Sequence, residues 1–584
     1  MKTLVLLLIF KLFQTVHSES SYVTVETLSG NVRGYNLSIS GYNAVGSDVD
    51  TLHIFLGVPY AEPPVGDRRF THPMPKAAWR PRTIDALRLA SSCPQGESFL
   101  QTYDFAADYA DFDEDCLYLN VYVPQSWARV DATWPVMVFI HGGSYTYGSG
   151  GAYDGRILAQ EGVVVVTVNY RVDALGFLST DDDVAPGNYG LLDQLTALRW
   201  VKDNIARFHG DASRITVFGQ SAGGSGVSLH MFSPLANGLF TSLIPQSGTA
   251  FSPFAIYRPP HSPRTYALEL GLAVGCPQNT SAALVACLRT KDALLLARTP
   301  VSQPPMIATF APRVDGYFLT DLPEVLMMRG AYLKCINILT GYLPNEVAED
   351  YESVDGINNG LSKETLESMF HDKSRRFLSN ADEIYQALTC AYPPSNDVIR
   401  NRKYLIDMNS DYGYVSPHIR LAESLVQHKE HVWLYEFTYR SPNSQKREWI
   451  GVPHAEELYY QFGAPFFDST PCPAARNLTC QVKWGTYQQW DEHDRRVARN
   501  TMQLWADFAR LPACSSTFPS TAAGSGEWPP FGQNHALLNI SNFVRTAHLQ
   551  MTSGQRLWAS FNYLNLSAPV PDVCGREVHI LVGK

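Results

Sequence analysis

The stretch Ile215-Thr-Val-Phe-Gly-Gln-Ser221-Ala-Gly-Gly224 decides the fold of this chain. Its first four residues form a strand pattern that leads into Gly219-x-Ser221-x-Gly223, and a helix-compatible run follows from Ala222 to Phe232. Small residues on both sides of the serine permit a strained, close-packed turn between strand and helix. Such a turn raises the Ser221 hydroxyl above the sheet edge and aims the N–H groups of a helix N-terminus at the same place. The pattern predicts a nucleophile beside part of an oxyanion site. Glycine and serine are common, so a glycine-rich loop is the alternative that the rest of the chain must exclude.

Buried strands and amphipathic helices alternate on both sides of this stretch. Residues 135–140 and 163–168 are short, continuous apolar runs, typical of strands covered on both faces. Apolar residues recur at helical spacing between 190 and 208, which predicts an amphipathic helix there. Further strands are predicted at 335–339, 432–438 and 577–582, and further helical segments at 361–404 and 490–510. This alternation indicates an α/β fold with right-handed crossovers and a large, mostly parallel central sheet flanked by helices.

Length, composition and charge restrict the classes of function. The chain has 584 residues, of which 45% are hydrophobic, enough for a large core. It shows no repeat and no clear linker, so we expect a single large α/β domain over residues 19–584. The formal net charge is −10 and the basic residues are scattered. Nucleic acid is therefore not an expected partner, because phosphate binding needs a concentrated positive face.

The first eighteen residues have the pattern of a secretory signal peptide. Met1-Lys-Thr precedes the apolar run Leu4–Phe10, and the small Ser18 is the expected cleavage position. The alternative is a buried N-terminal helix. No later run of eighteen apolar residues occurs, so no membrane span is expected and the protein is predicted to be secreted.

The ten cysteines fit an oxidising compartment. Cys93 and Cys116 bracket one loop, and Cys276 and Cys287 bracket another, which favours local pairing of each. Four further cysteines leave their pairing open, because Cys472 and Cys480 are close in sequence while Cys390 and Cys514 could compete with them for partners. No cysteines have the spacing of metal ligands, so no metal site is predicted. N-glycosylation sequons, which are expected to be used in a secreted protein, stand at Asn36, Asn279, Asn477, Asn539 and Asn565.

Residues suited to acyl transfer follow several of the predicted strands. The reaction needs a nucleophile, a base, an acid that orients the base, and donors for the developing oxyanion. Ser221 is the nucleophile, and the loop His141-Gly-Gly-Ser144, which also follows a strand, offers backbone N–H groups. Glu346 and His454 are favoured as acid and base because each follows a buried strand, in the order Ser, Glu, His. With sixteen histidines in the chain, the pattern alone does not decide the base.

Several sequence segments together resemble the type-B carboxylesterase/cholinesterase family. The resemblance runs from about residue 22 to 560 and is carried by Phe55-Leu-Gly-Val-Pro-Tyr-Ala, Glu114-Asp-Cys-Leu-Tyr-Leu-Asn120, Asn169-Tyr-Arg, Gly176-Phe-Leu, Gly187-Asn-Tyr-Gly-Leu-Leu-Asp-Gln194, Phe218-Gly-Gln-Ser-Ala-Gly-Gly224 and Gln246-Ser-Gly248. It implies an α/β-hydrolase fold, no cofactor, and a Ser221–Glu346–His454 triad. It also implies that the oxyanion donors are the N–H groups of Gly143, Ser144 and Ala222.

The resemblance also implies a disulfide pattern. It pairs Cys93 with Cys116, Cys276 with Cys287, and Cys390 with Cys514. Cys335, Cys472, Cys480 and Cys574 are then left without family partners, and a pair between 472 and 480 is our expectation. Cys574 either bridges two chains of a homodimer or pairs internally.

Three departures from the family pattern bear on the substrate. Ser144 stands where the family usually has the third glycine of the oxyanion loop. Its side chain is expected to narrow access to the active site. Cholinesterases carry a tryptophan in the loop equivalent to 93–116, where this chain has none and Ala106 falls near that place. They also carry Glu before the nucleophile, where this chain has Gln220. Two features that stabilise a choline cation are therefore missing, and neutral esters are the expected small-molecule substrates.

Three functional hypotheses follow. The first is a secreted carboxylesterase that cleaves neutral carboxylic esters. The second is a specialised esterase of that kind, because Gln220-Ser-Ala-Gly also resembles the serine motif of juvenile-hormone esterases. The third is a non-catalytic adhesion protein like the neuroligins, which share the fold but lack the serine and continue into a membrane span. The serine at 221 favours catalysis.

Overall fold

The computed structural model describes most of the chain. The described residues are 21–39, 48–96, 111–126, 133–304, 307–377, 381–469, 489–520, 522, 526–532, 534–560, 569–570 and 578–579. The predicted signal peptide lies outside the described residues, and so do Ala106, Cys472, Asn477, Cys480, Asn565 and Cys574.

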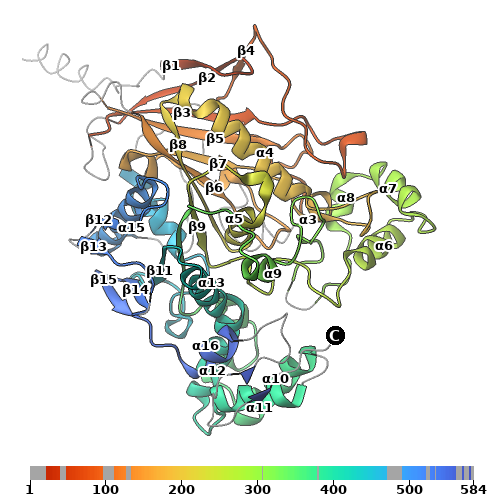
Figure 1. Cartoon of the computed structure of the whole chain (residues 1–584), viewed down its shortest axis with the longest axis vertical. Helices are drawn as coiled ribbons and strands as arrows, with labels where there is room; N and C mark the ends of the chain where they lie inside the picture. The colour runs from red at the N-terminus through yellow and green to blue at the C-terminus, as the bar shows by residue number, and fades with distance from the viewer. Residues whose placement is uncertain are drawn as a thin grey trace, which may run out of the picture.

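A thirteen-stranded sheet runs through the molecule and carries its helices on both faces (Figure 1). Its order is β1-β2-β3-β5-β7-β6-β8-β9-β10-β11-β14-β15, with β4 paired to β2. The central strands are parallel to one another: β6 (Trp134–Ile140), β7 (Val164–Val168), β8 (Gly210–Gln220), β9 (Ser242–Gln246), β10 (Asn337–Tyr342), β11 (Val432–Phe437) and β14 (Ala536–Ile540). The predicted mostly parallel sheet of the α/β-hydrolase fold is thus confirmed.

Antiparallel strands extend this sheet at both edges. On one side lie β1 (Ser21–Glu26), β2 (Asn31–Ser38), β3 (Thr51–Pro59) and β5 (Tyr118–Gln125), with β4 (Thr83–Asp85) parallel to β2. On the other side β15 (Val544–His548) pairs with β14. Two small ribbons lie apart from the sheet, β12 (Phe518–Ser520) with β13 (Gly526–Trp528), and β16 (Pro569–Val570) with β17 (Val578–His579). The strand predicted at 577–582 therefore belongs to a ribbon of its own.

The alternation of side chains along each strand divides the core into two layers. Val136 and Val138 of β6 pack in one hydrophobic cluster with α4 (Tyr189–Asn204) and α5 (Ala222–Phe232). Met137 and Phe139 of the same strand point the other way, into a second cluster with α15 (Glu492–Ala509). Both faces of the central strands are covered, which explains why these strands read as continuous apolar runs.

The remaining helices lie around these layers. They are α3 (Asp173–Phe177), α6 (Pro263–Ala273), α7 (Ser281–Arg289), α8 (Ala293–Arg298), α9 (Pro323–Met328), α10 (Lys363–Ser374), α11 (Ala381–Ala391), α12 (Val398–Ser410), α13 (Ser416–Gln427), α14 (Glu457–Gln461) and α16 (Ser553–Ala559). The predicted helical segment 361–404 is thus three helices, and the helix predicted at 190–208 ends as one 3₁₀ turn after Asn204. In the described part of the chain, we find no helix with the length and apolarity needed to cross a bilayer.

Three disulfides join described cysteines, and one of them corrects the predicted pairing. Cys93–Cys116 and Cys276–Cys287 are present as expected. Cys514 is bonded to Cys335, with the two Cα atoms 4.5 Å apart, and not to Cys390, which is disulfide-bonded as well.

The segments that carry Cys335 and Cys514 are held together by a side chain next to the disulfide. The Asn337 amide donates to the carbonyl of Pro512 at 2.8 Å and accepts the N–H of Ser515 at 2.9 Å. These bonds fix the residues after α15 against the start of β10. Cys335, which precedes that strand, therefore meets Cys514.

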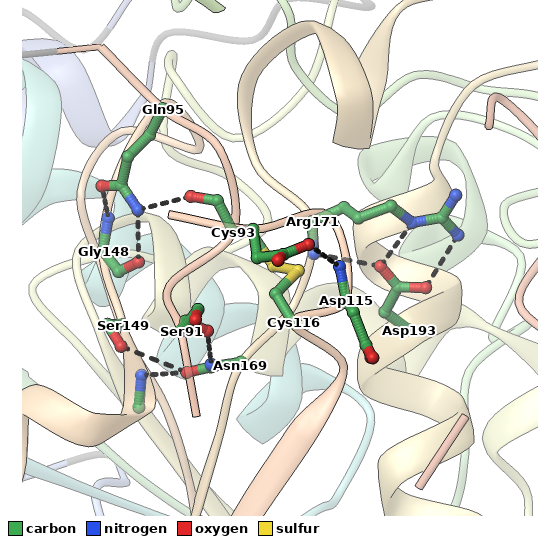
Figure 2. Close-up of a disulfide and its surroundings, with 12 residues drawn as sticks. Ser91, Cys93, Gln95, Asp115, Cys116, Gly148, Ser149, Asn169, Arg171 and Asp193 are labelled. Atoms are coloured by element: carbon green, nitrogen blue, oxygen red, sulfur yellow. Dashed lines mark hydrogen bonds and ion pairs between the residues drawn. A yellow bond between two sulfur atoms is a disulfide. The ribbon is translucent and has the colours of Figure 1, made fainter. Parts of the chain in front are cut away.

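A buried ion pair ties α4 to the loop after β7. The guanidinium of Arg171 donates to both carboxylate oxygens of Asp193 at 2.8 Å, and the Arg171 N–H donates to the same group at 3.0 Å (Figure 2). The two side chains are 3% and 0% exposed. Each charge is therefore removed from water and depends on its partner.

We expect Asp193→Ala to lower the free energy of unfolding by about 3–5 kcal/mol, because it leaves the Arg171 guanidinium buried without a carboxylate. Chemical denaturation with the disulfides intact measures the change. Asp85→Ala is the matched control, since it breaks a pair with Arg33 in which both side chains are about half exposed, and it should change stability far less. Equal losses in the two variants would contradict this prediction.

Candidate active site

Ser221 occupies a strained turn between β8 and α5. Its φ and ψ are 60° and −127°, outside the regions that serine ordinarily adopts. The turn is fixed because the Ser221 N–H donates to the carbonyl of Gln246 in β9 at 2.8 Å. A Cβ atom on Gly223 would lie 2.1 Å from the carbonyl oxygen of Ile140, so only glycine fits there. The Gly-x-Ser-x-Gly pattern is therefore a strand-to-helix elbow here, and not a loop.

The loop after β6 packs directly against this elbow. A Cβ atom on Gly142 would lie 2.6 Å from the carbonyl oxygen of Gln220 and 3.0 Å from Cβ of Ser221. Gly143 has φ +105°, and Ser144 has φ 56° although it is not glycine. The loop thus approaches the elbow at Gly142, and Ser144 lines the same cavity as Ser221, after which Ala222 begins α5. This is the arrangement expected for the predicted oxyanion donors.

The Cys93–Cys116 disulfide supports the far end of that loop (Figure 2). Gln95 donates its side-chain amide to the carbonyls of Cys93 and Gly148, at 2.9 and 3.0 Å. In return Gln95 accepts the N–H of Gly148 at 2.8 Å. Gly148 has φ +126°, and a Cβ atom there would lie 2.1 Å from Nδ1 of His141. Gln95 therefore holds the Gly148 end of the loop, and Gly148 in turn packs against His141 at the start of the loop.

Glu346 and His454 meet above two neighbouring parallel strands. Glu346 follows β10, and His454 lies on the loop that follows β11. Their side chains are 2.5 Å apart, from Oε2 of Glu346 to Nδ1 of His454. The other oxygen of Glu346 accepts the N–H of Leu343 at 2.9 Å, and the carboxylate is fully buried. The structure thus brings together the two residues that the sequence selected as acid and base.

The second nitrogen of His454 faces the elbow. Its Nε2 atom is 3.0 Å from the side-chain amide nitrogen of Gln220, the residue immediately before Ser221. An amide nitrogen donates, so Nε2 accepts, and the proton of the neutral ring sits on Nδ1 towards Glu346. The three predicted catalytic residues therefore converge on one edge of the sheet.

The environment of His454 favours the protonated ring. Burial lowers the pKa of His454, but the carboxylates of Glu346, Glu457 and Asp350 more than offset it and leave this pKa above its ordinary value. Glu457 is fully buried behind the pair, where burial and then Glu346 raise the pKa of Glu457 to about 8. Glu346 supplies the largest favourable effect on His454 and orients its ring.

A cavity of about 470 Å³ reaches Ser221. Phe254 and Tyr414 form an aromatic wall, with ring centroids 5.1 Å apart, and Tyr414 also lies 4.9 Å from the ring of His454. Tyr414 belongs to one turn of π-helix between α12 and α13, a local feature that is common at functional sites. The other lining residues are Ser144, Gln303, Ile307, Ala308, Val347, Asp350, Tyr351, Met369, Asp372, Lys373, Arg376, Leu405, Met408, Asn409 and Gly413. The cavity has the size and mixed lining of a small-molecule site.

Comparison with known proteins identifies the family to which the chain belongs. The model of the carboxylesterase family matches residues 19–556. The chain belongs to the carboxylesterase family. Its relatives in that family include neuroligin-2 of Mus musculus, 36% identical over 84% of this chain and 60% of that protein. Cholinesterase of Mus musculus is 33% identical over 90% of this chain and 84% of that protein. The chain spans about 60% of the length of the neuroligins that it matches.

The structure adds residues to the site of this carboxylesterase-family chain that the sequence analysis did not predict. Gln95, which fixes the oxyanion loop, and Glu457, which lies behind the triad, carry no local signal. Lys373 in α10 reads as a surface lysine, yet it is buried in the cavity wall. Their positions depend on contacts between segments far apart in the chain.

We expect the imidazole of His454 to titrate with a pKa above 6.5, because the surrounding carboxylates stabilise its protonated form. Glu346→Gln should move that titration to lower pH. Histidine-selective NMR measures both, and His454→Gln assigns the resonance. Glu352→Gln, an exposed carboxylate in the same loop that pairs with Arg447, should leave the titration unchanged. A wild-type pKa below 6.5 would contradict the prediction.

Proposed function

We propose that this protein is a serine hydrolase that cleaves neutral carboxylic esters through an acyl-enzyme intermediate. The observation that carries the proposal is the hydrogen-bonded series from Glu346 to His454 to the elbow of Ser221, at the end of a cavity open to a small molecule. A structural cluster needs no such strained serine beside a buried acid and base.

The proposed reaction uses the same residues in two half-cycles. Nε2 of His454 leaves the amide of Gln220, takes the Ser221 proton, and Oγ bonds to the ester carbonyl carbon. The N–H groups of Gly143, Ser144 and Ala222 hold the oxyanion, and Glu346 stabilises the imidazolium. The C–O bond to the alcohol breaks as His454 returns the proton to the alcohol oxygen. Water then repeats the sequence and releases the acid and free Ser221.

We propose that the enzyme acts outside the cell. The leader pattern at residues 1–18 and the disulfides support this localisation. Among the described sequons, Asn279 is exposed in a turn and is the best acceptor for a glycan. Asn539 lies in β14 and donates its amide to Glu436 at 3.4 Å, so a glycan there would replace that bond.

A second candidate is a non-catalytic adhesion protein. Its support is the similarity to neuroligin-2 and neuroligin-3. The assembled Glu346–His454 pair favours catalysis, because adhesion needs neither that pair nor the strained Ser221. A homodimer fits both candidates.

A fluorophosphonate probe distinguishes the two candidates. We expect it to label the wild-type protein covalently and to leave Ser221→Ala unlabelled, with kcat for a neutral ester lower by about 10⁴- to 10⁶-fold in that variant. Ser213→Ala, an exposed serine near the start of β8, is the control and should be labelled like the wild type. Wild-type protein that stays unlabelled would favour the adhesion candidate.

We expect choline esters to be poor substrates, because Gln220 supplies a neutral amide where a carboxylate would attract the choline cation. The measurement compares kcat/KM for acetylthiocholine with that for 4-nitrophenyl acetate. Efficient turnover of acetylthiocholine at low concentration would refute the assignment to neutral esters.

A further inference from the structure

A buried histidine contacts the segment that supports the elbow of the proposed nucleophile. His418, in the first turn of α13, has no exposed surface. Its Nε2 atom accepts the N–H of Gly248 at 2.9 Å, and its Nδ1 atom lies 2.5 Å from Oγ1 of Thr340 in β10. The Thr340 hydroxyl donates to the carbonyl of Pro245 in β9 at 3.0 Å. His418 therefore holds both ends of the segment 245–248, one directly and the other through Thr340.

The donors and acceptors of this hydrogen-bonded series are determined. A backbone N–H only donates, so Nε2 of His418 accepts and carries no proton. The proton of the neutral ring is then on Nδ1 and is donated to Thr340, whose own hydroxyl proton goes to Pro245. Burial lowers the pKa of His418 to about 3, so the ring is neutral at neutral pH. The series is therefore complete under the conditions in which the proposed enzyme works.

The segment 245–248 is in direct backbone contact with the elbow. The Ser221 N–H donates to the carbonyl of Gln246 at 2.8 Å. A Cβ atom on Gly248 would lie 2.1 Å from the carbonyl oxygen of Ser221, and one on Gly224 would lie 2.6 Å from the carbonyl oxygen of Gln246. The two backbones are thus too close for a side chain between them. A displacement of the segment 245–248 would therefore displace the elbow as well.

The end of this segment depends on His418 for its position. Ser221 has φ 60° and ψ −127°, a strained conformation that persists only where the surrounding structure fixes it. Strand β9 ends at Gln246, and the next N–H, of Ser247, still donates to the carbonyl of Gly341 at 2.9 Å. Gly248 lies beyond the end of the strand, and His418 supplies the acceptor for its N–H.

Another buried histidine provides a comparison. His230 in α5 also has no exposed surface, and burial likewise lowers the pKa of His230 to about 3. Its Nε2 atom lies 3.0 Å from Oε1 of Gln194 in α4, and its ring lies 5.3 Å from the ring of Phe318. These contacts join α4, α5 and the chain around Phe318, and none of them involves the segment 245–248. Burial is common to both histidines, and the contact with the support of the elbow is particular to His418.

We propose that His418 is a positioning residue for the nucleophile. It holds the segment 245–248 through Gly248 and Thr340, and that segment fixes the backbone of Ser221 so that its hydroxyl is aligned for attack. The inference rests on the proposed function and adds a positioning residue to the same site. His418 transfers no proton in the reaction, because both of its ring nitrogens are engaged in these bonds.

The kinetic test uses 4-nitrophenyl acetate and the rate of labelling by a fluorophosphonate. We expect His418→Leu to lower kcat and the labelling rate by about 10- to 100-fold with KM nearly unchanged, because the nucleophile is misplaced while the cavity is retained. His418→Gln should keep most of the wild-type kcat, since its amide can accept from Gly248 and donate to Thr340. Thr340→Val, which is close to threonine in shape, should lower kcat because it removes the hydroxyl between His418 and Pro245.

The matched control is His230→Leu, which removes an equally buried imidazole. It should lower the free energy of unfolding without a comparable change in kcat, because its bond leads to Gln194. Equal losses of kcat in His418→Leu and His230→Leu would overturn the proposal, and so would a loss in His418→Gln as large as that in His418→Leu. If His418→Leu does not fold, Thr340→Val decides the question, and a wild-type kcat in that variant would overturn the proposal.

Amide hydrogen exchange separates this inference from the proposed catalysis, because it needs no turnover. We expect faster exchange of the N–H groups of Ser221 and Gly248 in His418→Leu than in the wild type, and no such change in His230→Leu. If the wild type neither reacts with the probe nor hydrolyses the ester, yet this exchange depends on His418, the proposed catalysis is wrong and the support of the elbow stands. If kcat and exchange are both independent of His418 in an active enzyme, the positioning role is wrong and the catalysis stands.

Discussion

The contact between Glu346 and His454 is the constraint on which the site depends. A carboxylate with no exposed surface is tolerated only with partners, and Glu346 finds them in the His454 ring and the N–H of Leu343. Both residues lie beyond the carboxyl ends of parallel strands, β10 and β11, which are neighbours in the sheet. The loops that follow these strands are joined where the His454 N–H donates to the carbonyl of Glu346 at 3.2 Å, which holds the two side chains near each other. Strand β8, two strands away from β10, brings the elbow to the same edge.

The side chain at position 220 determines what Nε2 of His454 contacts. Nε2 of His454 accepts from the amide of Gln220, so the resting ring is neutral at the nitrogen that must receive a proton. A carboxylate at that position would instead favour protonation of the ring and attract cations into the cavity. In the proposed function, the contact with Gln220 leaves Nε2 of His454 as an acceptor, although Glu346, Glu457 and Asp350 favour the imidazolium. An amide in place of a carboxylate at position 220 also removes an attraction for cationic substrates.

The sequence predicted what local patterns encode and missed what distant contacts decide. The bounds of α5 and the elbow at Ser221 follow from one short stretch, because glycines and apolar periodicity act over a few residues. The Cys335–Cys514 disulfide spans 179 residues and depends on how Asn337 joins two segments. Family resemblance selected Glu346 and His454, which the structure places in contact, yet it gave the wrong partner for Cys514. Lys373 sits in a charged helix, where composition alone predicts a solvated side chain.

Family membership narrows the chemistry less than the cavity does. The same family includes proteins named cholinesterase and neuroligin, so the shared fold is compatible with more than one role. What bears on the ligand is the lining of the cavity at Ser221, where carboxylates surround His454 and Gln220 supplies a neutral amide. That amide and the aromatic wall of Phe254 and Tyr414 are compatible with the proposed ligand, which is neutral at its reacting group.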